Sequence, residues 1–298
     1  MRSLCPIVRG EDRLVPTAVR VRELVAGAAS TLAGAGVASP TREARRLLVL
    51  AAGPGAVALG PGDRVAPGVR RRYRVLVTAR ARRVPLALLE GETGFLDFDV
   101  TVSPGVFVPR PETEELAERA VAILGSLPAE PRALDLGTGS GALALAVARA
   151  RTDARVVAVD ASPRALACAR RNVRAHGLVG QVEVRQSDWY SRVPERFHLI
   201  VANPPYVARP DLPDLDPEVR HYEPRRALAG GVDGLSAIRL ILSGACRHLL
   251  TAGNILVEIG DGQGTAVLRF ARGVPGLVET RVEEDLRGKE RFFSGRCA

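Results

Sequence analysis

Residues 133–142 read ALDLGTGSGA, a short apolar strand that runs into a glycine-rich turn and then into a predicted helix over Ala142–Arg149. Only glycine lets the backbone approach a ligand closely at such a turn. The next predicted strand, Val156–Val159, ends at Asp160, roughly twenty residues further on, where a carboxylate can accept both hydroxyl groups of a ribose. The stretch therefore predicts a site for a nucleotide-containing cofactor at the carboxyl end of a parallel sheet.

The glycine turn alone does not decide which cofactor is bound. Gly137, Gly139 and Ala142 also fit the G-x-G-x-x-A pattern of nicotinamide-dependent oxidoreductases. Such an enzyme needs a catalytic acid or base in its cleft, and the sequence shows no Ser-Tyr-Lys or His-Asp arrangement that would supply one. A nicotinamide-dependent oxidoreductase stays a competing hypothesis because of the glycine pattern, but the missing acid or base makes it the less favoured one.

Helix and strand patterns alternate on both sides of this stretch. Further helices are predicted over Glu112–Leu124, Pro163–His176, Leu235–Leu250 and Thr265–Ala271. Strands are predicted over Ala133–Leu136, Val182–Val184, Phe197–Ala202, Ile255–Ile259, Val278–Val282 and Arg291–Phe293, with a long proline-rich loop before Leu235. This alternation is typical of an α/β fold with a mostly parallel, doubly wound, Rossmann-like sheet.

The first ninety residues show helical periodicity instead. Their apolar positions predict a small bundle of three amphipathic helices, over residues 19–34, 39–53 and 67–83. In the third helix Val69, Tyr73, Leu76 and Val77 are expected to face inward. Its outer face is expected to carry seven arginines: Arg70, Arg71, Arg72, Arg74, Arg80, Arg82 and Arg83.

The periodicity changes to two between the bundle and the α/β region. Alternation from Phe95 to Val102, a turn at Ser103–Gly105 and a second apolar run at Val106–Val108 predict a β-hairpin. We therefore expect three parts: a helical substrate-recognition domain over residues 1–90, a hairpin linker over 91–109 and a catalytic domain over 110–298.

The tetrad Asn203-Pro204-Pro205-Tyr206 follows the strand that ends at Ala202. A neutral amide or exocyclic amine is a poor nucleophile because its lone pair is delocalised, so an enzyme must position the nitrogen and oppose the delocalisation. The Asn203 side-chain oxygen and the Pro204 carbonyl can each accept one N–H, while Tyr206 can stack on the planar group. Both prolines restrict the backbone around that carbonyl. These four residues are the predicted catalytic residues, and they need no general base.

Together these motifs resemble the HemK/PrmC protein-glutamine methyltransferases, which modify the glutamine of the Gly-Gly-Gln tripeptide in class 1 peptide chain release factors. The resemblance runs from about Phe95 to the C-terminus. It rests on FVPRPETE at 107–114, DLGTGSGA at 135–142, QSDW at 186–189, NPPY at 203–206, and Glu223-Pro224. NPPY is shared with adenine-amino DNA and guanine-amino RNA methyltransferases, whereas FVPRPETE separates the family from them.

The resemblance implies a class I methyltransferase domain over residues 110–298, with S-adenosyl-L-methionine as its cofactor and a release factor as its protein substrate. It implies that Asp160 contacts the ribose, that Asp188 and Trp189 lie on the adenine side, and that Arg110 and Glu112 shape the mouth of the site or form a structural ion pair. The full set of implied cofactor-binding residues is Gly137, Thr138, Gly139, Ser140, Gly141, Asp160, Asp188, Trp189 and Asn203.

The charge of the chain leaves a second substrate class open. A formal charge of +9 and a pI near 10.3 suit a polyanionic partner such as RNA, which the arginine-rich third helix could contact weakly. However, Lys289 is the only lysine, so arginine is preferred throughout the chain. An amino methyltransferase that acts on RNA or DNA bases, or on another protein, is therefore an alternative hypothesis.

Several other classes do not fit the composition. No apolar run approaches the roughly 18 residues that cross a bilayer, and the N-terminus lacks the apolar stretch of an export signal, so we expect a cytoplasmic protein. The four cysteines form no CxxC pair and the four histidines no HExxH pattern, so we expect free buried thiols and no metal site. We expect a monomer.

Overall fold

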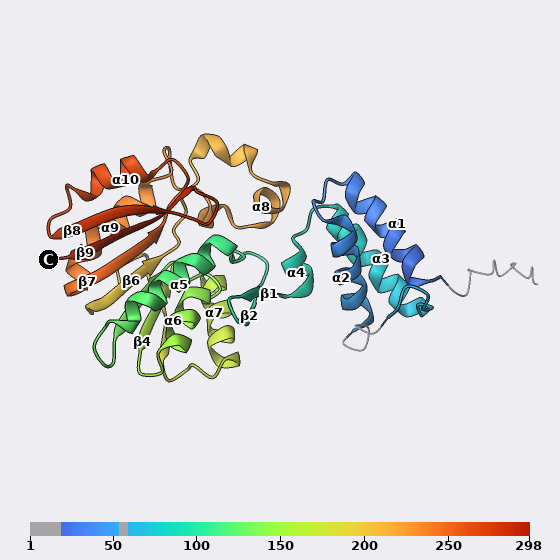
Figure 1. The fold of residues 1–298 in the computed structure, drawn as a ribbon, viewed down its shortest axis with the longest axis horizontal. Coiled ribbons are helices and arrows are strands. Elements are labelled where there is room, and N and C mark those ends of the chain that lie inside the picture. The colour runs from blue at the N-terminus through green and yellow to red at the C-terminus, as the bar shows by residue number, and fades with distance from the viewer. Residues whose placement is uncertain (1–18, 54–58) are drawn as a thin grey trace, which may run out of the picture. The chain divides into compact units, whose positions relative to one another are not determined.

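A computed structural model of the chain describes residues 19–53 and 59–298. Within it the chain divides into two compact units, Met1–Leu89 and Glu90–Ala298 (Figure 1). The N-terminal stretch from which we predicted the absence of an export signal, and Cys5, lie outside the described residues. Each unit has its own hydrophobic core.

The first unit is a helical bundle. Its helices are α1 (Val21–Gly34), α2 (Pro40–Ala52), α3 (Pro67–Ala81) and the short α4 (Leu86–Glu90). The inner faces of the first three meet in one core that includes Leu32, Leu47 and Tyr73. The Tyr73 hydroxyl donates to the Ala44 carbonyl at 3.0 Å, so its polar end is satisfied inside that core. The three predicted amphipathic helices are confirmed.

Arg80 does not lie on the outer face of α3 as predicted. It is 5% exposed, and its guanidinium pairs with the Glu43 carboxylate of α2. Helical geometry explains the position, because Arg80 lies seven residues after Tyr73 and three after Val77, on the same face as these buried residues. A buried guanidinium needs such a partner, since an unpaired charge in the core is costly.

The second unit is built on a seven-stranded sheet in the order β5-β4-β3-β6-β7-β9-β8. Its strands are β3 (Arg132–Leu136), β4 (Arg155–Asp160), β5 (Val182–Gln186), β6 (Phe197–Ala202), β7 (Leu249–Glu258), β8 (Leu277–Glu284) and β9 (Glu290–Cys297). Six of its strands run in the same direction, and β9 runs in the opposite direction between β7 and β8. The predicted mostly parallel, doubly wound α/β sheet is therefore confirmed.

Helices cover both faces of the sheet. The first face is covered by α5 (Pro111–Gly125), α6 (Ala142–Ala150) and α7 (Pro163–Ala175), whose buried residues share one core with alternate strand positions. The second is covered by α9 (Ser236–His248) and α10 (Gly264–Ala271), which share another core (Figure 1). Each strand therefore needs apolar residues on both sides, which explains the continuous apolar runs in the sequence.

The ends of three central strands bring the candidate site together. β3 pairs with β4 on one side and with β6 on the other, with Leu136 opposite both Val159 and Ala202. The glycine turn, Asp160 and Asn203 directly follow or end these strands. Parallel strands end at the same edge of a sheet, and the connections turn in opposite directions beside β3, which is where open α/β sheets bind ligands.

The β-hairpin differs from the prediction. β1 (Glu92–Phe95) pairs with β2 (Phe98–Thr101), and the turn lies at Leu96 and Asp97. The predicted turn at Ser103–Gly105 is present, with Val106 N–H donating to the Ser103 carbonyl at 3.1 Å, but it does not connect the strands of the hairpin, and Val106–Val108 is not a strand. The connecting turn was missed because the alternation from Phe95 onward conceals a two-residue turn that contains no glycine or asparagine. Leu96 nevertheless takes the left-handed conformation, with φ of 53°. The hairpin packs into the core of the second unit through Phe95, Phe98 and Val100.

The predicted proline-rich loop between β6 and α9 is more ordered than expected. It contains the 3-10 turn η2 (Arg209–Asp214), helix α8 (Pro217–Tyr222) and the 3-10 turn η3 (Arg225–Ala227). Each begins next to or at a proline, which suits the first turn of a helix because proline has no N–H to leave unpaired.

Two cysteines of the second unit are paired. Cys246 of α9 and Cys297 of β9 form a disulfide across 51 residues, with 5.5 Å between their Cα atoms. The prediction of free thiols was wrong for this pair, because only the sheet topology brings α9 and the end of β9 together and the spacing gives no sign of it. Cys168 is buried and free.

Two features are absent from the described part of the chain. None of its helices combines the length and the apolar character that a transmembrane segment needs. Over the same residues no cluster of three or more His, Cys, Asp or Glu side chains is arranged to hold a metal ion.

Candidate active site

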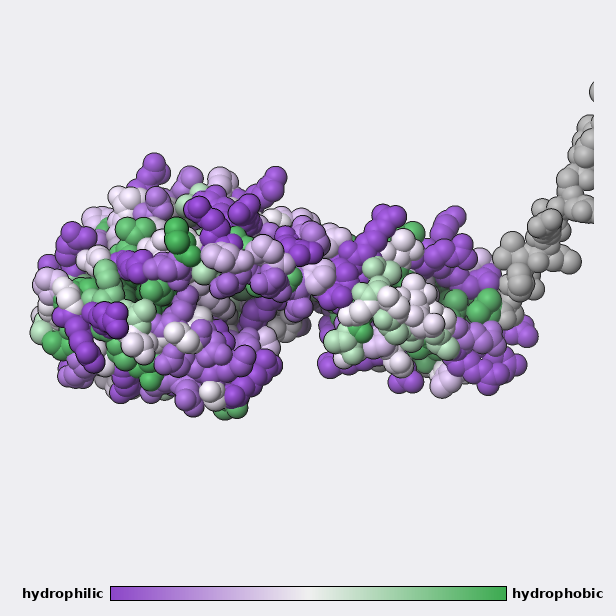
Figure 2. All heavy atoms as spheres, turned by 90° about the horizontal axis from the view of Figure 1, so that it is seen from above, coloured by the Kyte–Doolittle hydropathy of each residue, from purple (hydrophilic) through white to green (hydrophobic). Residues whose placement is uncertain are grey.

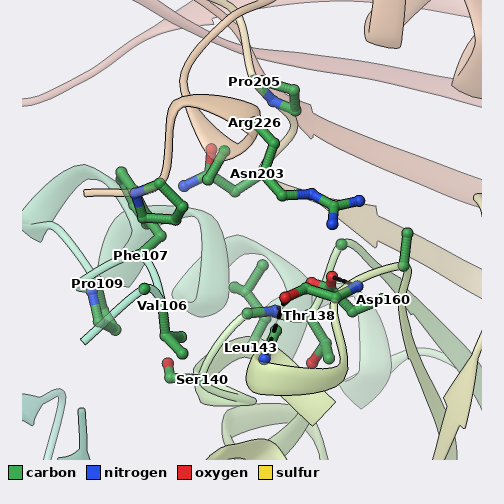
Figure 3. Close-up of a pocket in the computed structure, with 18 of the residues that line it drawn as sticks. Val106, Phe107, Pro109, Thr138, Ser140, Leu143, Asp160, Asn203, Pro205 and Arg226 are labelled. Carbon is green, nitrogen blue, oxygen red and sulfur yellow. Dashed lines mark hydrogen bonds between the residues drawn. The ribbon is translucent and has the colours of Figure 1, made fainter. Parts of the chain in front are cut away.

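A cavity of about 300 Å³ lies at the carboxyl ends of β3, β4 and β6 (Figure 3). This volume is at the lower end of the roughly 300–1,000 Å³ found for small-molecule and cofactor pockets. Nine of the predicted site residues lie in its wall: Gly137, Thr138, Gly139, Ser140, Asp160, Asp188, Trp189, Asn203 and Pro205. The other predicted residues, Gly141, Pro204, Tyr206, Arg110 and Glu112, do not line it.

The side chain of Asp135 binds the glycine turn through hydrogen bonds. One carboxylate oxygen, Oδ2, accepts hydrogen bonds from the Thr138 hydroxyl at 2.6 Å and the Ala144 N–H at 3.2 Å. Asp135 is 1% exposed, and burial raises the pKa of its carboxyl to about 7. The side chain therefore ties the end of β3 to the turn and to the first turn of α6.

Gly141 has a packing role at the start of α6. Its φ is +89°, and a Cβ at this position would lie 3.3 Å from both Cα and Cβ of Ala169 in α7. A side chain here would be strained by the left-handed backbone and crowded by α7. The glycine lets α6 begin close to α7, and this explains why Gly141 belongs to the motif without lining the cavity.

Asp160 is fixed by backbone donors at the end of β4. Its Oδ2 accepts from the Gly139 N–H at 3.0 Å, and its Oδ1 accepts from the Ser162 N–H at 2.7 Å. Each carboxylate oxygen can accept more than one hydrogen bond. The side chain is thus oriented by the fold and keeps acceptor capacity toward the cavity, as a ribose-binding carboxylate requires.

A tight turn after β5 presents Asp188 and Trp189 to the cavity. The Ser187 hydroxyl donates to the Trp189 carbonyl at 2.7 Å and accepts from the Arg192 N–H at 3.0 Å. Trp189 has φ of +47°, a conformation that a bulky residue adopts only when its surroundings enforce it. Such enforced strain is common at ligand sites, and here it places an aromatic ring in the wall.

Asn203 is oriented by a chain of hydrogen bonds that runs from the cavity wall, to which Thr113 also belongs, to the buried Glu258. Its Nδ2 donates to Thr113 Oγ1 at 2.8 Å, and the Thr113 hydroxyl in turn donates to Glu258 Oε2 at 2.9 Å. Thr113 lies in the first turn of α5, and Glu258 is the last residue of β7. Because the NH2 group is engaged with Thr113, the amide oxygen of Asn203 is left to accept a hydrogen bond.

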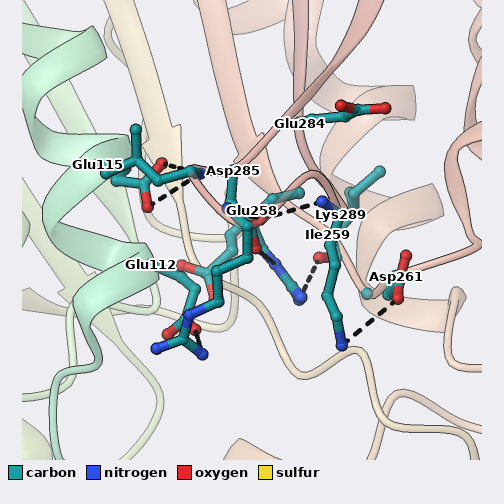
Figure 4. Close-up of polar contacts among 12 residues, drawn as sticks. Glu112, Glu115, Glu258, Ile259, Asp261, Glu284, Asp285 and Lys289 are labelled. Carbon is teal, nitrogen blue, oxygen red and sulfur yellow. Dashed lines mark hydrogen bonds and ion pairs between the residues drawn. The ribbon is translucent and has the colours of Figure 1, made fainter.

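Glu258 is a fully buried carboxylate, with 0% exposure. Besides Thr113, the Tyr206 hydroxyl donates to it, with 3.1 Å between Oη and Oε1. Burial raises the pKa of Glu258 to about 7, although these two hydrogen bonds and the charge of Arg291 oppose the rise. Figure 4 shows its polar surroundings, with Glu112 and Glu115 of α5 and the turn that contains Asp285.

The backbone after Asn203 is held by hydrogen bonds with the segment that precedes α9 and with Gln263, which precedes α10. Val207 N–H donates to the Leu228 carbonyl at 2.9 Å, and Gln263 Nε2 donates to the Tyr206 carbonyl at 2.9 Å. A Cβ at Gly234 would overlap that Tyr206 carbonyl, so only glycine fits there. The corner that carries the NPPY tetrad is therefore rigid. Tyr206 packs partly buried beside the cavity, and stacking on a substrate stays a prediction.

Arg110 and Glu112 are both in ion pairs, although not with each other. Arg110 pairs with the buried Glu223, and its guanidinium lies 5.2 Å from the centre of the Phe107 ring. Phe107 lines the cavity, as do Pro224, Arg226 and Ala227 beside Glu223. Arg110 therefore joins two segments of the wall.

Glu112 has a different partner. Its carboxylate pairs with the guanidinium of the exposed Arg287 at 3.3 Å.

Thr113, Glu258 and Arg226 were not among the predicted site residues. Thr113 stands inside the quoted FVPRPETE segment, but nothing local indicates its distant partners. Glu258 carried a usable signal, because an acidic residue inside the apolar run 255–259 must be buried and therefore needs partners. Arg226 enters the wall from η3 and is directed into the cavity in Figure 3.

The fold and the cavity define a class of protein. A sheet of this order, with a glycine turn after β3 and an acid at the end of β4, is that of a class I methyltransferase. Residues 98–214 match the family described as Methyltransferase small domain. A solved 16S rRNA methyltransferase of T. thermophilus, in complex with AdoMet and guanosine, shares the fold with a TM-score of 0.51 and 20% identity, over 70% of this chain and 50% of that chain.

Named relatives then identify the family. The release factor glutamine methyltransferase of Cereibacter sphaeroides is 41% identical over 93% of this chain and 99% of its own length. That of Mycolicibacterium smegmatis is 39% identical over 92% of this chain and 97% of its own length. Residues 23–91 match the family described as PrmC N-terminal domain. The chain belongs to the release factor glutamine methyltransferase family, which confirms the predicted resemblance.

Proposed function

We propose that this protein transfers a methyl group from S-adenosylmethionine to the side-chain amide nitrogen of a glutamine in a class 1 peptide chain release factor. The observation that carries the proposal is the orientation of Asn203, whose NH2 group is bound by Thr113 while its oxygen is left for a donor. A glutamine amide supplies such a donor. The names of the relatives support the substrate class.

The residues of the cavity fit S-adenosylmethionine. Asp160 has remaining acceptor capacity for ribose hydroxyls, and Trp189 and Asp188 supply an aromatic face and an acceptor for an adenine. The glycine turn would hold the methionine part through Gly137, Thr138, Gly139 and Ser140. When bound, this cofactor supplies a methyl group on a positively charged sulfur, which a nitrogen lone pair can attack.

The chain itself has to orient the amide nitrogen and reduce its delocalisation. Asn203 Oδ1 accepts one N–H of the substrate amide, and the Pro204 carbonyl accepts the second. Two acceptors that fix both hydrogens favour a tetrahedral nitrogen, in which the lone pair is available. The clamped backbone from Tyr206 to Val207 holds both acceptors still. No side chain is needed as a base, because the methylated nitrogen is strongly acidic before it loses its proton.

The test is methyl transfer from isotopically labelled S-adenosylmethionine to a folded class 1 release factor, followed by mass spectrometry of its peptides. We expect the mass of one methyl group on the Gly-Gly-Gln glutamine and on no other residue. Methylation of a base in RNA or DNA, with an unmodified release factor, would contradict the proposal and favour the nucleic-acid alternative.

The charge of the helical unit favours a weak additional contact with RNA. Residues 1–89 contain 16 arginines against 5 acidic residues, a net charge of +11, whereas residues 90–298 contain 26 basic and 28 acidic residues, a net charge of −2. A preference for arginine throughout the chain does not explain this difference. Hydrophilic side chains cover much of the visible face of this unit in Figure 2.

Salt dependence tests this contact. Binding of a short RNA hairpin to the full chain should weaken steeply with salt, because each neutralised phosphate releases counterions. Arg71 and Arg74 are exposed on α3, and their joint change to glutamate should lower the RNA affinity about tenfold or more while leaving cofactor binding unchanged. Equal affinity of this variant and the wild type would contradict the contact.

A further inference from the structure

We propose that Glu258 is a positioning residue, which acts through Thr113 to make the side chain of Asn203 present its oxygen rather than its NH2 group to the cavity. The inference rests on the proposed function and assigns a role to a carboxylate that does not touch the cavity. Glu258 is separated from Thr113 by 145 positions in the chain, and Thr113 from Asn203 by 90.

The direction of the hydrogen bonds follows from the donors available. An ionised carboxylate can only accept, so the single hydroxyl hydrogen of Thr113 is committed to Glu258. Thr113 can then only accept from Asn203, which must turn its NH2 group toward it. The Asn203 oxygen consequently faces the other way. One buried charge thus decides whether the cavity wall offers an acceptor or a donor.

Loss of that charge removes the constraint. Without an ionised Glu258, the Thr113 hydroxyl is free to donate to Asn203, and the amide can turn over. Asn203 would then present N–H donors to the N–H donors of a substrate amide, which repel each other. Glu258 also accepts from the Tyr206 hydroxyl, so the same carboxylate fixes the side chains at both ends of the NPPY tetrad.

The surroundings of Glu258 make the arrangement sensitive to pH. Two residues of α5 face Glu258: Thr113, and Glu112 with its negative charge. Tyr206 faces it from the corner after β6, and the positively charged Arg291 faces it from β9. Arg291 is itself engaged with Asp285 and with the Ile259 carbonyl. With a pKa near 7, Glu258 loses its proton as the pH rises through neutrality, and the acceptor orientation forms as it does so.

The experiment compares Glu258→Gln, Thr113→Val and Thr113→Ser with the wild type, with a recombinant class 1 release factor as substrate. Glutamine replaces the acceptor-only carboxylate by an amide whose NH2 group can donate to Thr113, and valine removes the Thr113 hydroxyl. Both change the shape little, and we expect kcat to fall roughly 10- to 100-fold in both. Thr113→Ser restores the hydroxyl and should recover at least about a third of the wild-type kcat. The double variant Glu258→Gln/Thr113→Val should be no slower than the slower single variant, because both act through Asn203.

Two further measurements separate positioning from a general loss of structure. Affinity for S-adenosylhomocysteine, measured by calorimetry, should stay within about threefold of the wild type in every variant, since Glu258 lies outside the cavity wall and the substitutions at Thr113, which lies in the wall beside Asn203, nearly keep the size of its side chain. The wild-type kcat should rise as the pH passes through about 7, and this rise should be absent in Glu258→Gln.

Three results would overturn the proposal. The first is a Glu258→Gln variant with the kcat and pH profile of the wild type, and the second is a double variant whose loss of kcat is the product of the two single losses. The third is a loss of S-adenosylhomocysteine affinity as large as the loss of kcat. Failure of the wild type to methylate any glutamine would instead overturn the proposed function, and the role of Glu258 with it. If the wild type methylates the glutamine and the variants do so equally well, only the role of Glu258 is overturned.

Discussion

The two sides of the cavity are built in different ways. On the cofactor side, the hydrogen-bonded residues are close in the chain: Asp135 and Thr138 are three residues apart, Asp160 and Ser162 two, and Gly139 and Asp160 21. The backbone supplies most of the donors. On the substrate side, the bonds join side chains that are 52 to 145 residues apart: Tyr206 to Glu258, Asn203 to Thr113 and Thr113 to Glu258. The cofactor side is therefore preorganised by local backbone geometry, whereas the substrate side depends on a few buried side chains.

This difference predicts that single substitutions separate the two sides. Changes on the substrate side should lower the rate of transfer at full cofactor occupancy. Changes on the cofactor side should weaken cofactor binding or destabilise the sheet edge, and leave the rate at saturation nearly unchanged.

The largest effect is expected for Asn203→Ala. Removing the acceptor that orients the nitrogen should lower kcat roughly 100- to 1,000-fold, about 3–4 kcal/mol of transition-state stabilisation. The affinity for S-adenosylhomocysteine should change less than about threefold, as calorimetry can measure. A comparable loss of both would mean that Asn203 belongs to the cofactor side and that the two sides are not separable.

A smaller effect of the opposite kind is expected for Asp160→Asn. The loss of charge-assisted hydrogen bonds to a ribose should raise the cofactor dissociation constant roughly 10- to 100-fold. At saturating cofactor the kcat should stay within about threefold of the wild type. An unchanged dissociation constant would remove Asp160 from the cofactor site.

Gly141→Ala tests the packing that supports the glycine turn. A non-glycine residue at φ of +89° whose Cβ crowds Ala169 should lower the free energy of unfolding by about 2–3 kcal/mol, measured by urea denaturation. Ala148→Gly, within the same helix α6, serves as a control for a general change in helix stability. A loss of less than about 0.5 kcal/mol for Gly141→Ala would mean that α6 and α7 can move apart without cost.

The pH dependence of stability should report Asp135. Its pKa is raised from 3.8 to about 7, so between these values the folded protein holds a proton that the unfolded chain has released. Stability attributable to this group therefore falls as the pH rises from about 4 to 7. Asp135→Asn removes this dependence. Between pH 5 and pH 8 the free energy of unfolding of the variant should therefore fall by about 1–2 kcal/mol less than that of the wild type. Parallel pH profiles for the two proteins would contradict the raised pKa.

The smallest effect is expected for Glu112→Gln. Glu112 pairs with an exposed arginine, Arg287, and such pairs contribute no more than about 1 kcal/mol. We expect the Michaelis constant for the release factor and the kcat both to change less than about twofold. A tenfold rise in the Michaelis constant would show that Glu112 contacts the substrate, as one of the two interpretations of the FVPRPETE segment holds.

The same difference explains what could be predicted from the sequence. The glycine turn, Asp160 and the NPPY corner are marked by neighbouring residues, because a strand end, a turn and a helix start leave a local pattern. The core strands could be predicted because they are apolar on both faces. The partners of Asn203, Arg110 and Cys246 could not, since each lies beyond fifty residues and is brought close only by the order of the strands. The hairpin turn at Leu96 and Asp97 was missed because leucine is unusual in the left-handed conformation that Leu96 adopts.

The most direct test of the account is a crystal structure of the protein with S-adenosylhomocysteine and a release factor that carries the Gly-Gly-Gln tripeptide. We expect the glutamine side-chain nitrogen to lie within hydrogen-bond distance of Asn203 Oδ1, about 2.7–3.2 Å, while Asn203 Nδ2 still donates to Thr113. A glutamine nitrogen bound elsewhere in the cavity, or an Asn203 amide turned so that its NH2 group faces the substrate, would contradict it.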